Sequence, residues 1–169
     1  MDNNKVKAQG TLSTINESAH KMLDAMNDII WNIQPQNDIL ENIIARMISF
    51  ASELLEARNI SLKYHIADNI NHLHLGLGVR HDFFVIFKEA VNNLAKYSEA
   101  TEAHINLEFL QPYIILSISD NGKGFDSKII RNGNGLKNMK TRAIELNGSI
   151  SITSETGNGT KVSLTVNLK

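Results

Sequence analysis

Glycine is concentrated in one short stretch of this chain, and that stretch limits which secondary structures the segments before and after it can form. Residues 120–136 begin with Asp-Asn-Gly-Lys-Gly and end with Gly-Asn-Gly-Leu. The first glycine pair follows a predicted strand, and the second opens a predicted helix. Glycine allows positive φ and the close approach of a ligand to the backbone, and a helix N-terminus offers N–H groups to a phosphate. The pattern therefore indicates either two tight structural turns or a loop that holds a phosphorylated ligand.

The composition is that of one soluble globular domain. Of the 169 residues, 42% are hydrophobic and 21% are charged. The net charge of −1 gives no general attraction to nucleic acid or to an anionic membrane surface. The chain has no cysteine, which excludes disulfides, zinc–thiolate sites and thiol catalysis. No apolar run approaches the roughly 18 residues needed to cross a bilayer.

Apolar residues before Pro35 recur in steps of three and four, at Leu12, Ile15, Ala19, Met22, Met26, Ile29 and Ile33. This is a heptad seam, typical of a helix that pairs with another helix. Packing of the helix on its own domain is the alternative. We therefore divide the chain into residues 1–35, a polar tail and a helix, and residues 36–169, a separate domain.

Beyond Pro35 the pattern alternates between helices and strands. An Asp38-x-x-Glu41 capping pattern precedes a helix whose apolar face runs from Leu40 to Leu55. Two further helices are predicted over 79–97 and 136–146, the second ended by Asn147-Gly148. Strands are predicted over 60–66, 103–110, 113–119, 149–154 and 160–168, with hairpin turns at 111–112 and 157–159. We expect an α+β fold, a two-layer sandwich of mostly antiparallel sheet with helices on one side.

The helix predicted over 79–97 has two different faces. Its apolar residues are Phe83, Phe84, Phe87, Ala90, Val91 and Leu94. Four polar residues follow one another at spacings of four, three and one, which places them together on a second face of the helix: Glu89, Asn93, Lys96 and Tyr97. An asparagine oxygen suits Mg²⁺, a lysine suits phosphate and a glutamate suits a general base. An ordinary solvated helix face is the alternative.

Four segments, in this order, resemble the motifs of the GHKL ATPase superfamily, and specifically the ATP-binding catalytic domain of sensor histidine kinases. Residues 88–100 resemble its N box, and 120–124 its first glycine box. Residues 133–136 resemble the second glycine box, and 157–160 the last. The resemblance covers about 58–169 and implies that 36–169 is an ATP-binding domain with a Bergerat-type fold.

The resemblance implies an adenine end of the site. Asp120 would accept a hydrogen bond from the exocyclic amine of adenine, where guanine presents a carbonyl that a carboxylate would repel. Gly122 and Gly124 would let the backbone pass close to the base. Tyr97 would line the ribose and base, and Thr160 would support adenine through water.

It also implies a phosphate end, with ATP and Mg²⁺ as cofactors. Asn93 would bind Mg²⁺, Lys96 would contact the phosphates, and Glu89 would be the general base. The β- and γ-phosphates would lie at the second glycine box and the helix start that follows, at Gly133, Gly135 and Leu136.

Two departures from the usual pattern resemble the nitrate-sensor and lipid-desaturation-sensor subfamily. Only eight residues separate Gly124 from Gly133, a short lid without a phenylalanine-rich box. Glu89 stands where many histidine kinases have asparagine. Residues 26–35 resemble the end of that subfamily's dimerisation helix pair, so 1–35 would contain the C-terminal part of such a pair. Tyr97 departs from the histidine that this subfamily often has.

A histidine kinase needs a phosphoacceptor histidine on its dimerisation hairpin. His20 is followed by lysine, His81-Asp82 lies at the head of the helix predicted over 79–97, and His72-x-His74 has no evident third metal ligand. We therefore expect the acceptor to lie upstream and this chain alone not to autophosphorylate.

The resemblance implies a two-component sensor kinase that forms a homodimer through the N-terminal helix and serves a response-regulator receiver domain. Neither nucleic acid nor membrane is an expected partner of this segment, which would be cytoplasmic in a membrane-anchored protein. Two alternatives stay open. One is a non-catalytic, nucleotide-gated switch, against which Glu89, Asn93 and Lys96 argue. The other is a related enzyme, such as an anti-sigma-type serine kinase or a clamp-type ATPase, against which the heptad helix argues.

Overall fold

The computed structural model describes residues 39–70, 73–126 and 134–168, together with 15–16, 18–19, 22–23, 26–27, 30–31 and 34. The chain divides into two compact units, Met1–Asn37 and Asp38–Lys169. In the described part of the chain no helix is long and apolar enough to cross a membrane.

In the first unit, most of the described residues are helical. The expected heptad positions Ile15, Met22 and Met26 lie in helix and are exposed. Leu12, Ile29 and Ile33 of the same seam lie outside the described residues, as does His20. Pairing of this helix with a partner therefore stays a prediction.

The second unit contains three α-helices, one short 3-10 helix and a five-stranded sheet among its described residues. In chain order the elements are α2 (Leu40–Glu56), β1 (Ser61–Ile66), the short 3-10 helix η2 (Asp68–Ile70), α3 (Leu77–Tyr97), β2 (Glu102–Leu110), β3 (Tyr113–Asp120), α4 (Asn134–Glu145), β4 (Gly148–Ser154) and β5 (Thr160–Asn167). The strands and helices predicted beyond Pro35 are all present, with boundaries shifted by one or two residues in most cases.

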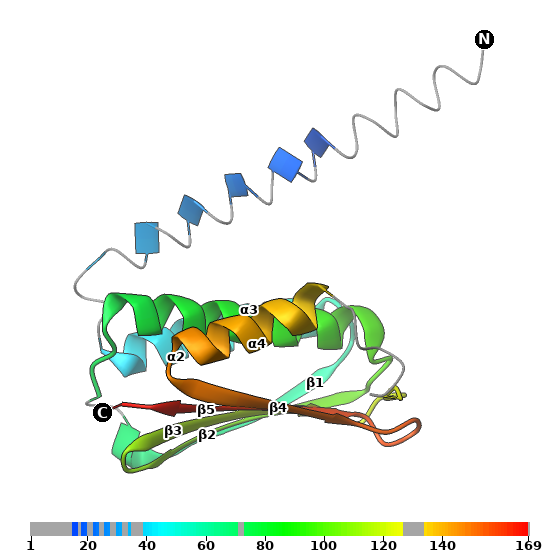
Figure 1. Cartoon of the computed structure of the whole chain (residues 1–169). Helices are drawn as coiled ribbons and strands as arrows, with labels where there is room; N and C mark the ends of the chain where they lie inside the picture. The colour runs from blue at the N-terminus through cyan, green and yellow to red at the C-terminus, as the bar shows by residue number, and fades with distance from the viewer. Residues whose placement is uncertain are drawn as a thin grey trace. The chain divides into compact units, whose positions relative to one another are not determined.

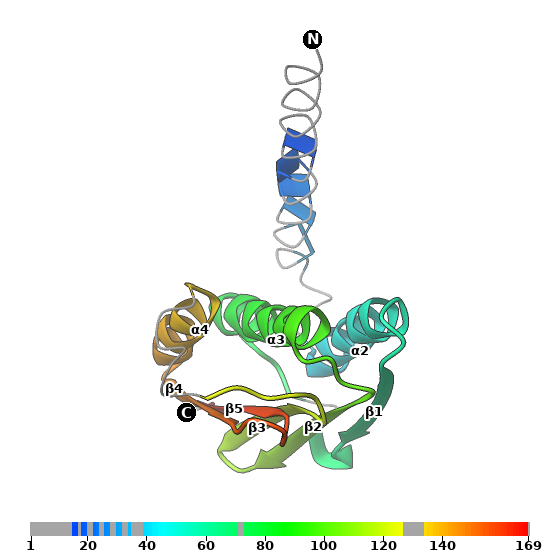
Figure 2. The ribbon, with the colours of Figure 1, turned by 90° about the vertical axis from the view of Figure 1, so that its right-hand side faces the viewer.

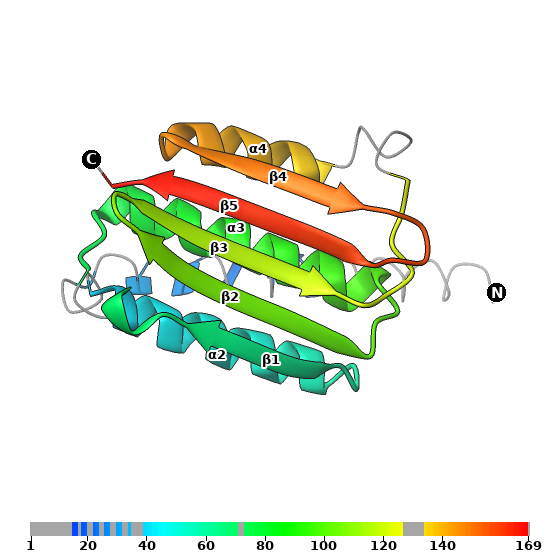
Figure 3. The same ribbon diagram turned by 90° about the horizontal axis from the view of Figure 1, so that it is seen from below.

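The helices α2, α3 and α4 lie side by side over one face of the sheet (Figures 1 and 2). Figure 3, seen from below, shows the other face of the sheet, which none of these helices covers. The predicted α+β two-layer sandwich is confirmed.

The strand order is β1-β2-β3-β5-β4. Three of the four strand pairs are antiparallel, as expected, but β1 and β2 pair in parallel. A parallel pair needs a crossover connection, and α3 forms part of it. The sheet is therefore mixed, and β3 and β5 bring Asp120 and Thr160 opposite each other at one end.

The core lies between the helices and the inner face of the sheet. Every residue of the apolar face predicted for α3 is buried, from Phe83 to Leu94. The ring centroid of Phe50 in α2 lies 6.5 Å from that of Phe84 and 6.4 Å from that of Phe87. This aromatic cluster joins α2 to α3 and leaves another side of α3 to face α4.

The start of α2 differs from the expectation that Asp38 and Glu41 form a capping box. The N-cap residue is Ile39, which makes no side-chain capping bond, and Asp38 lies outside the described residues. The backbone N–H of Leu40 instead donates to the carbonyl of Leu73 at 2.8 Å, and Ile39 forms a bridge with His74. A segment far along the chain thus accepts a hydrogen bond from a backbone N–H group in the first turn of α2. A local sequence pattern does not show such a contact.

The turns after α4 and before β5 agree with those that the sequence predicts. Asn147, two residues after the end of α4, adopts φ 51°, the left-handed conformation that commonly follows a helix. Gly157 and Gly159 have φ values of 85° and 69° in the β4–β5 turn. The predicted helix end and glycine hairpin are therefore confirmed.

Candidate functional site

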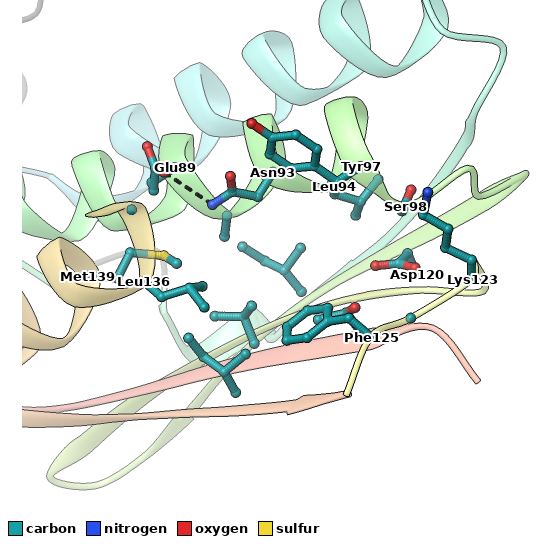
Figure 4. A pocket seen from close by; sticks show the side chains of 17 residues that line it. Glu89, Asn93, Leu94, Tyr97, Ser98, Asp120, Lys123, Phe125, Leu136 and Met139 are labelled. Carbon is teal, nitrogen blue, oxygen red and sulfur yellow. Dashed lines mark hydrogen bonds between the residues drawn. The ribbon is translucent and has the colours of Figure 1, made fainter. Parts of the chain in front are cut away.

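A cavity of about 660 Å³ lies between α3, α4 and the inner face of the sheet. Figure 4 shows Glu89 and Asn93 toward one end of it, Asp120 and Lys123 toward the other, and Leu136 and Met139 along the α4 side. The residues that line it are Glu89, Ala90, Asn93, Leu94, Tyr97, Ser98, Ile118, Asp120, Lys123, Gly124, Phe125, Gly135, Leu136, Met139, Ile152, Thr160 and Val162. Polar groups at two ends with apolar walls between them suit an elongated ligand that has one flat apolar part.

Asp120 ends β3 and presents a carboxylate to the cavity. Its Oδ1 atom accepts a hydrogen bond from the backbone N–H of Gly122 at 2.8 Å. Burial raises the pKa of the Asp120 carboxyl above its ordinary value, and hydrogen bonds from the backbone N–H groups of Gly122 and Thr160 oppose part of that rise. A carboxylate held in this way favours a ligand that donates a hydrogen bond to it.

The glycine segment after Asp120 is held against two other loops. The N–H of Lys123 donates to the carbonyl of Ser98 at 2.8 Å, and the N–H of Gly157 donates to the carbonyl of Lys123 at 2.7 Å. Gly124 has φ 57°, and a β-carbon there would lie 2.0 Å from the carbonyl oxygen of Glu155. The absence of a side chain at Gly124 therefore lets the loop close against the β4–β5 turn.

Asn121, the second residue of the same segment, ties it to the loop before β2. Its Oδ1 accepts hydrogen bonds from the N–H groups of Thr101 and Glu102, both at 3.0 Å. Its Nδ2 donates to the Thr101 hydroxyl at 2.9 Å. Asn121 thus fixes the backbone that carries Asp120 and does not itself line the cavity.

Ser154 of β4 joins the first glycine segment to the last. Its Oγ accepts the backbone N–H of Phe125 at 2.9 Å and donates to the carbonyl of Gly159 at 2.8 Å. The same atom lies 3.0 Å from the Thr160 hydroxyl. The loop that carries Phe125 and the strand that carries Thr160 are therefore held at one point.

The other end of the cavity is formed where α3 meets the start of α4. Asn93 Nδ2 donates to Glu89 Oε1 at 3.1 Å. A β-carbon at Gly135 would lie 2.0 Å from Glu89 Oε1, so a larger residue there would displace this carboxylate from its position. Glu89 and Asn93 thus share one face of α3, as their spacing predicts, and Glu89 also lies against the first turn of α4.

The structure brings most of the predicted site residues to the cavity. Glu89, Asn93, Tyr97, Asp120, Gly124, Gly135, Leu136 and Thr160 line it. Lys96 does not; its side chain is exposed on α3. Gly122 is buried behind the cavity wall against the Ser98 carbonyl. Gly133 and most of the short loop before it lie outside the described residues.

Sequence reasoning missed several residues that the structure places at the site. Lys123 lines the cavity, and its Nζ pairs with Glu99 Oε1 at 2.6 Å. Ser154 and Asn121 act through their hydrogen bonds to the loops. Lys123 and Asn121 lie inside the glycine segment, and that position is a signal that could have found them, whereas a single serine in a Ser/Thr-rich strand gives no signal.

None of the histidines in the described part of the chain lines the cavity: His65, His74, His81 and His104. His104 bonds to Glu102, and Asp82, next to His81, forms an ion pair with Arg142 of α4. His20 and His72 lie outside the described residues. Within the part of the chain that the structure describes, no group of three or more His, Cys, Asp or Glu side chains could hold a metal ion.

A family model described as histidine kinase-, DNA gyrase B-, and HSP90-like ATPase matches residues 78–169. The sensor protein VraS of Staphylococcus haemolyticus is 36% identical over 86 residues, which is 50% of this chain and 25% of that protein. The chain thus spans about a quarter of the length of this relative.

Solved structures agree on the fold. The histidine kinase AdeS of Acinetobacter baumannii superposes with a TM-score of 0.69 at 13% identity, covering 94% of this chain and 84% of the other. Full-length ShkA, solved in complex with AMPPNP, gives a TM-score of 0.66 at 14% identity, covering 94% and 38%.

These comparisons confirm the expected resemblance to the ATP-binding domain of sensor histidine kinases. The family match covers more than half of the chain and includes all of α3 except Leu77, the glycine segments and the whole cavity lining. The chain belongs to the histidine kinase-, DNA gyrase B- and HSP90-like ATPase family.

Proposed function

We propose that residues 36–169 bind Mg-ATP in the cavity between α3, α4 and the sheet, as the catalytic domain of a two-component sensor histidine kinase. The single observation that carries this proposal is the half-buried Asp120 carboxylate at one end of a cavity whose other end holds Glu89, Asn93 and the start of α4. This is the arrangement that a purine with a chain of phosphates requires.

Asp120 would select adenine. Its carboxylate accepts hydrogen bonds, adenine offers an amine at position 6, and guanine offers a carbonyl there. Ile118, Ile152 and Val162 supply apolar wall for the base. Tyr97, of which 65% is exposed at the rim, would cover the ribose side.

The phosphates would lie between α3 and the first turn of α4, with Glu89 as general base. An N-terminal helix turn favours anionic groups, and Lys96, exposed on α3, would reach in from outside the cavity wall. Gly133 would contribute from the segment that the structure leaves undescribed.

The residues present fit Mg²⁺. Asn93 offers a neutral amide oxygen and Glu89 a carboxylate beside it, and a Mg²⁺ site in nucleotide enzymes usually has one or two protein ligands, with phosphates and water supplying the rest. When bound, Mg²⁺ would neutralise part of the negative charge of the phosphates. Asn93 would be its ligand from this chain.

The activity and partners of the whole protein are part of the proposal. VraS is named a sensor protein, which supports a sensor kinase that dimerises through the N-terminal helix and passes phosphate to a response-regulator receiver domain. We place the domain in the cytoplasm, attached in the full protein to a membrane anchor. ShkA in complex with AMPPNP, an ATP analogue, supports nucleotide binding by this fold.

Asp120→Asn tests the adenine site directly. The variant loses a charge-assisted hydrogen bond in a half-buried site. The free energy of ATP binding should therefore become less favourable by about 1.5–3 kcal/mol, which lowers the affinity roughly tenfold to a hundredfold. The wild type should prefer ATP to GTP. Calorimetric titration with Mg-ATP measures both effects, and Asp68→Asn, which removes the same charge from an exposed residue outside the cavity, is the control. Equal ATP affinity for the wild type and Asp120→Asn would refute the site.

A further inference from the structure

Every hydrogen-bonding position of the Ser154 hydroxyl is occupied. The N–H of Phe125, the carbonyl of Gly159 and the hydroxyl of Thr160 all lie within 3.0 Å of Ser154 Oγ. Ser154 itself does not line the cavity, whereas Thr160 does. Ser154 therefore acts on the cavity through Thr160.

The proton count decides which hydroxyl donates. A serine hydroxyl has one proton and two acceptor positions. An amide N–H only donates and a carbonyl oxygen only accepts, so the Ser154 proton goes to Gly159 and one acceptor position goes to Phe125. The contact with Thr160 must then use the second acceptor position, which makes Thr160 the donor. The Thr160 proton points at Ser154, and its oxygen presents only lone pairs to the cavity.

Asp120 faces Thr160 across the β3–β5 pair and adds a second acceptor. The two residues are direct partners in the strand register, and an ionised carboxylate has only acceptor positions. The Lys123 ammonium at the same end is engaged by Glu99 at 2.6 Å. The paired side chains of Asp120 and Thr160 therefore favour a ligand edge, or a bridging water, that gives hydrogen bonds to both.

We infer that Ser154 is a positioning residue for base selectivity, which keeps Thr160 as an acceptor and thereby favours a 6-amino purine over a 6-oxo purine. This inference rests on the proposed ATP site and deepens it. An amino group at position 6 has two N–H bonds for such acceptors, whereas an oxo group has none and meets their lone pairs.

Removing the Ser154 hydroxyl should relax this selectivity. In Ser154→Ala the Thr160 hydroxyl is able to rotate and donate to a 6-oxo group or to its bridging water. The ratio of ATP to ITP affinity, measured by calorimetry with Mg²⁺, should fall roughly tenfold. Ser154→Thr keeps a hydroxyl at the same position and should keep the wild-type ratio.

Ser163→Ala is the matched control. Ser163 lies on β5, and its hydroxyl lies 3.3 Å from that of Ser117, so the variant removes one hydroxyl of a cross-strand pair in the same sheet, outside the cavity lining. It should leave the ATP-to-ITP ratio unchanged. In the double variant Ser154→Ala/Thr160→Val, the gain in ITP affinity should disappear, because no hydroxyl is left to donate.

A merely structural role for Ser154 would weaken ATP and ITP equally and leave the ratio unchanged, which would overturn the inference. If Ser154→Ala does not fold, Thr160→Val still tests the inference. The ratio of ATP to ITP affinity must fall in this variant, mainly because ATP binds more weakly. An unchanged ratio would overturn the inference. A wild type that binds ATP and ITP equally would refute the adenine site itself. Sensitivity of ATP binding to Asp120→Asn together with an unchanged Ser154→Ala ratio would refute only the role of Ser154.

Discussion

Asp120 is a residue whose proposed role in ATP binding opposes its effect on the stability of the ligand-free fold. Burial raises its pKa above the ordinary 3.8, so the folded chain holds the Asp120 proton more tightly than the unfolded chain does. The resulting stabilisation is fully present below the ordinary pKa and is lost as the pH rises through the raised folded-state pKa. At neutral pH the buried charge therefore destabilises the ligand-free fold.

Asp120→Asn should accordingly raise the stability of the ligand-free chain at pH 7, while it weakens ATP binding. An asparagine oxygen still accepts the Gly122 N–H, and no charge has to be buried. Thermal unfolding midpoints should be higher for the variant at pH 7, and the difference should shrink toward pH 3, where the wild-type carboxyl is protonated. Asp68→Asn controls for the loss of one exposed negative charge. A lower midpoint for Asp120→Asn at pH 7 would show that the carboxylate stabilises the fold.

Among the elements, α4 has the closest link between packing and the site. It carries Gly135, Leu136 and Met139 of the cavity, and Arg142 near its other end pairs with Asp82 of α3. The Asp82 side chain is only 16% exposed. The ion pair thus ties α4 to α3 at a point outside the cavity lining.

Arg142→Met should lower the free energy of unfolding by about 2 kcal/mol, because it leaves the largely buried Asp82 carboxylate without its cation while keeping most of the aliphatic contact. Urea unfolding at pH 7 measures this. Lys123→Met is the matched control: it makes the same kind of change in the Lys123–Glu99 pair, whose side chains are 56% and 74% exposed, and should cost at most about 0.5 kcal/mol. Equal losses in the two variants would mean that the burial of Asp82 does not matter.

Local patterns were enough to predict most elements of the second unit. The apolar residues of α3 repeat with a helical period and are all buried, and Asn147 and the glycines of the β4–β5 turn mark chain reversals by their own backbone preferences. These signals lie within a few residues of the structure that they specify. The turns and the approximate extents of the elements were therefore readable from the sequence.

Features that depend on contacts between residues far apart in the chain could not be predicted from the sequence. The parallel pairing of β1 with β2 and the bond from Leu40 to Leu73 both join segments that are far apart in the chain. At the site, Asp120 and Glu89 stood out by residue type and spacing. Ser154 did not, because its role comes from contacts with Phe125, Gly159 and Thr160, which only the fold brings together.

For the whole molecule, the position of the histidines decides what the chain can do with a bound nucleotide. Phosphoryl transfer needs an acceptor nitrogen close to the γ-phosphate and in line with the bond that breaks. His65 and His104 lie on neighbouring strands, His74 bridges to Ile39, and His81 stands beside the Asp82–Arg142 pair. None of these four lines the cavity.

The chain on its own should therefore bind ATP without accumulating phosphohistidine. Incubation with γ-labelled ATP should give almost no acid-labile, alkali-stable label, although calorimetry under the same conditions shows ATP binding that Asp120→Asn weakens. Adding a dimerisation hairpin helix that carries a histidine, in cis or as a separate domain, should produce label. That label should be absent in Asn93→Ala, because the chain then loses the amide oxygen proposed to hold Mg²⁺. Strong label in the chain alone that is lost in His20→Ala would contradict this prediction and make His20 the acceptor.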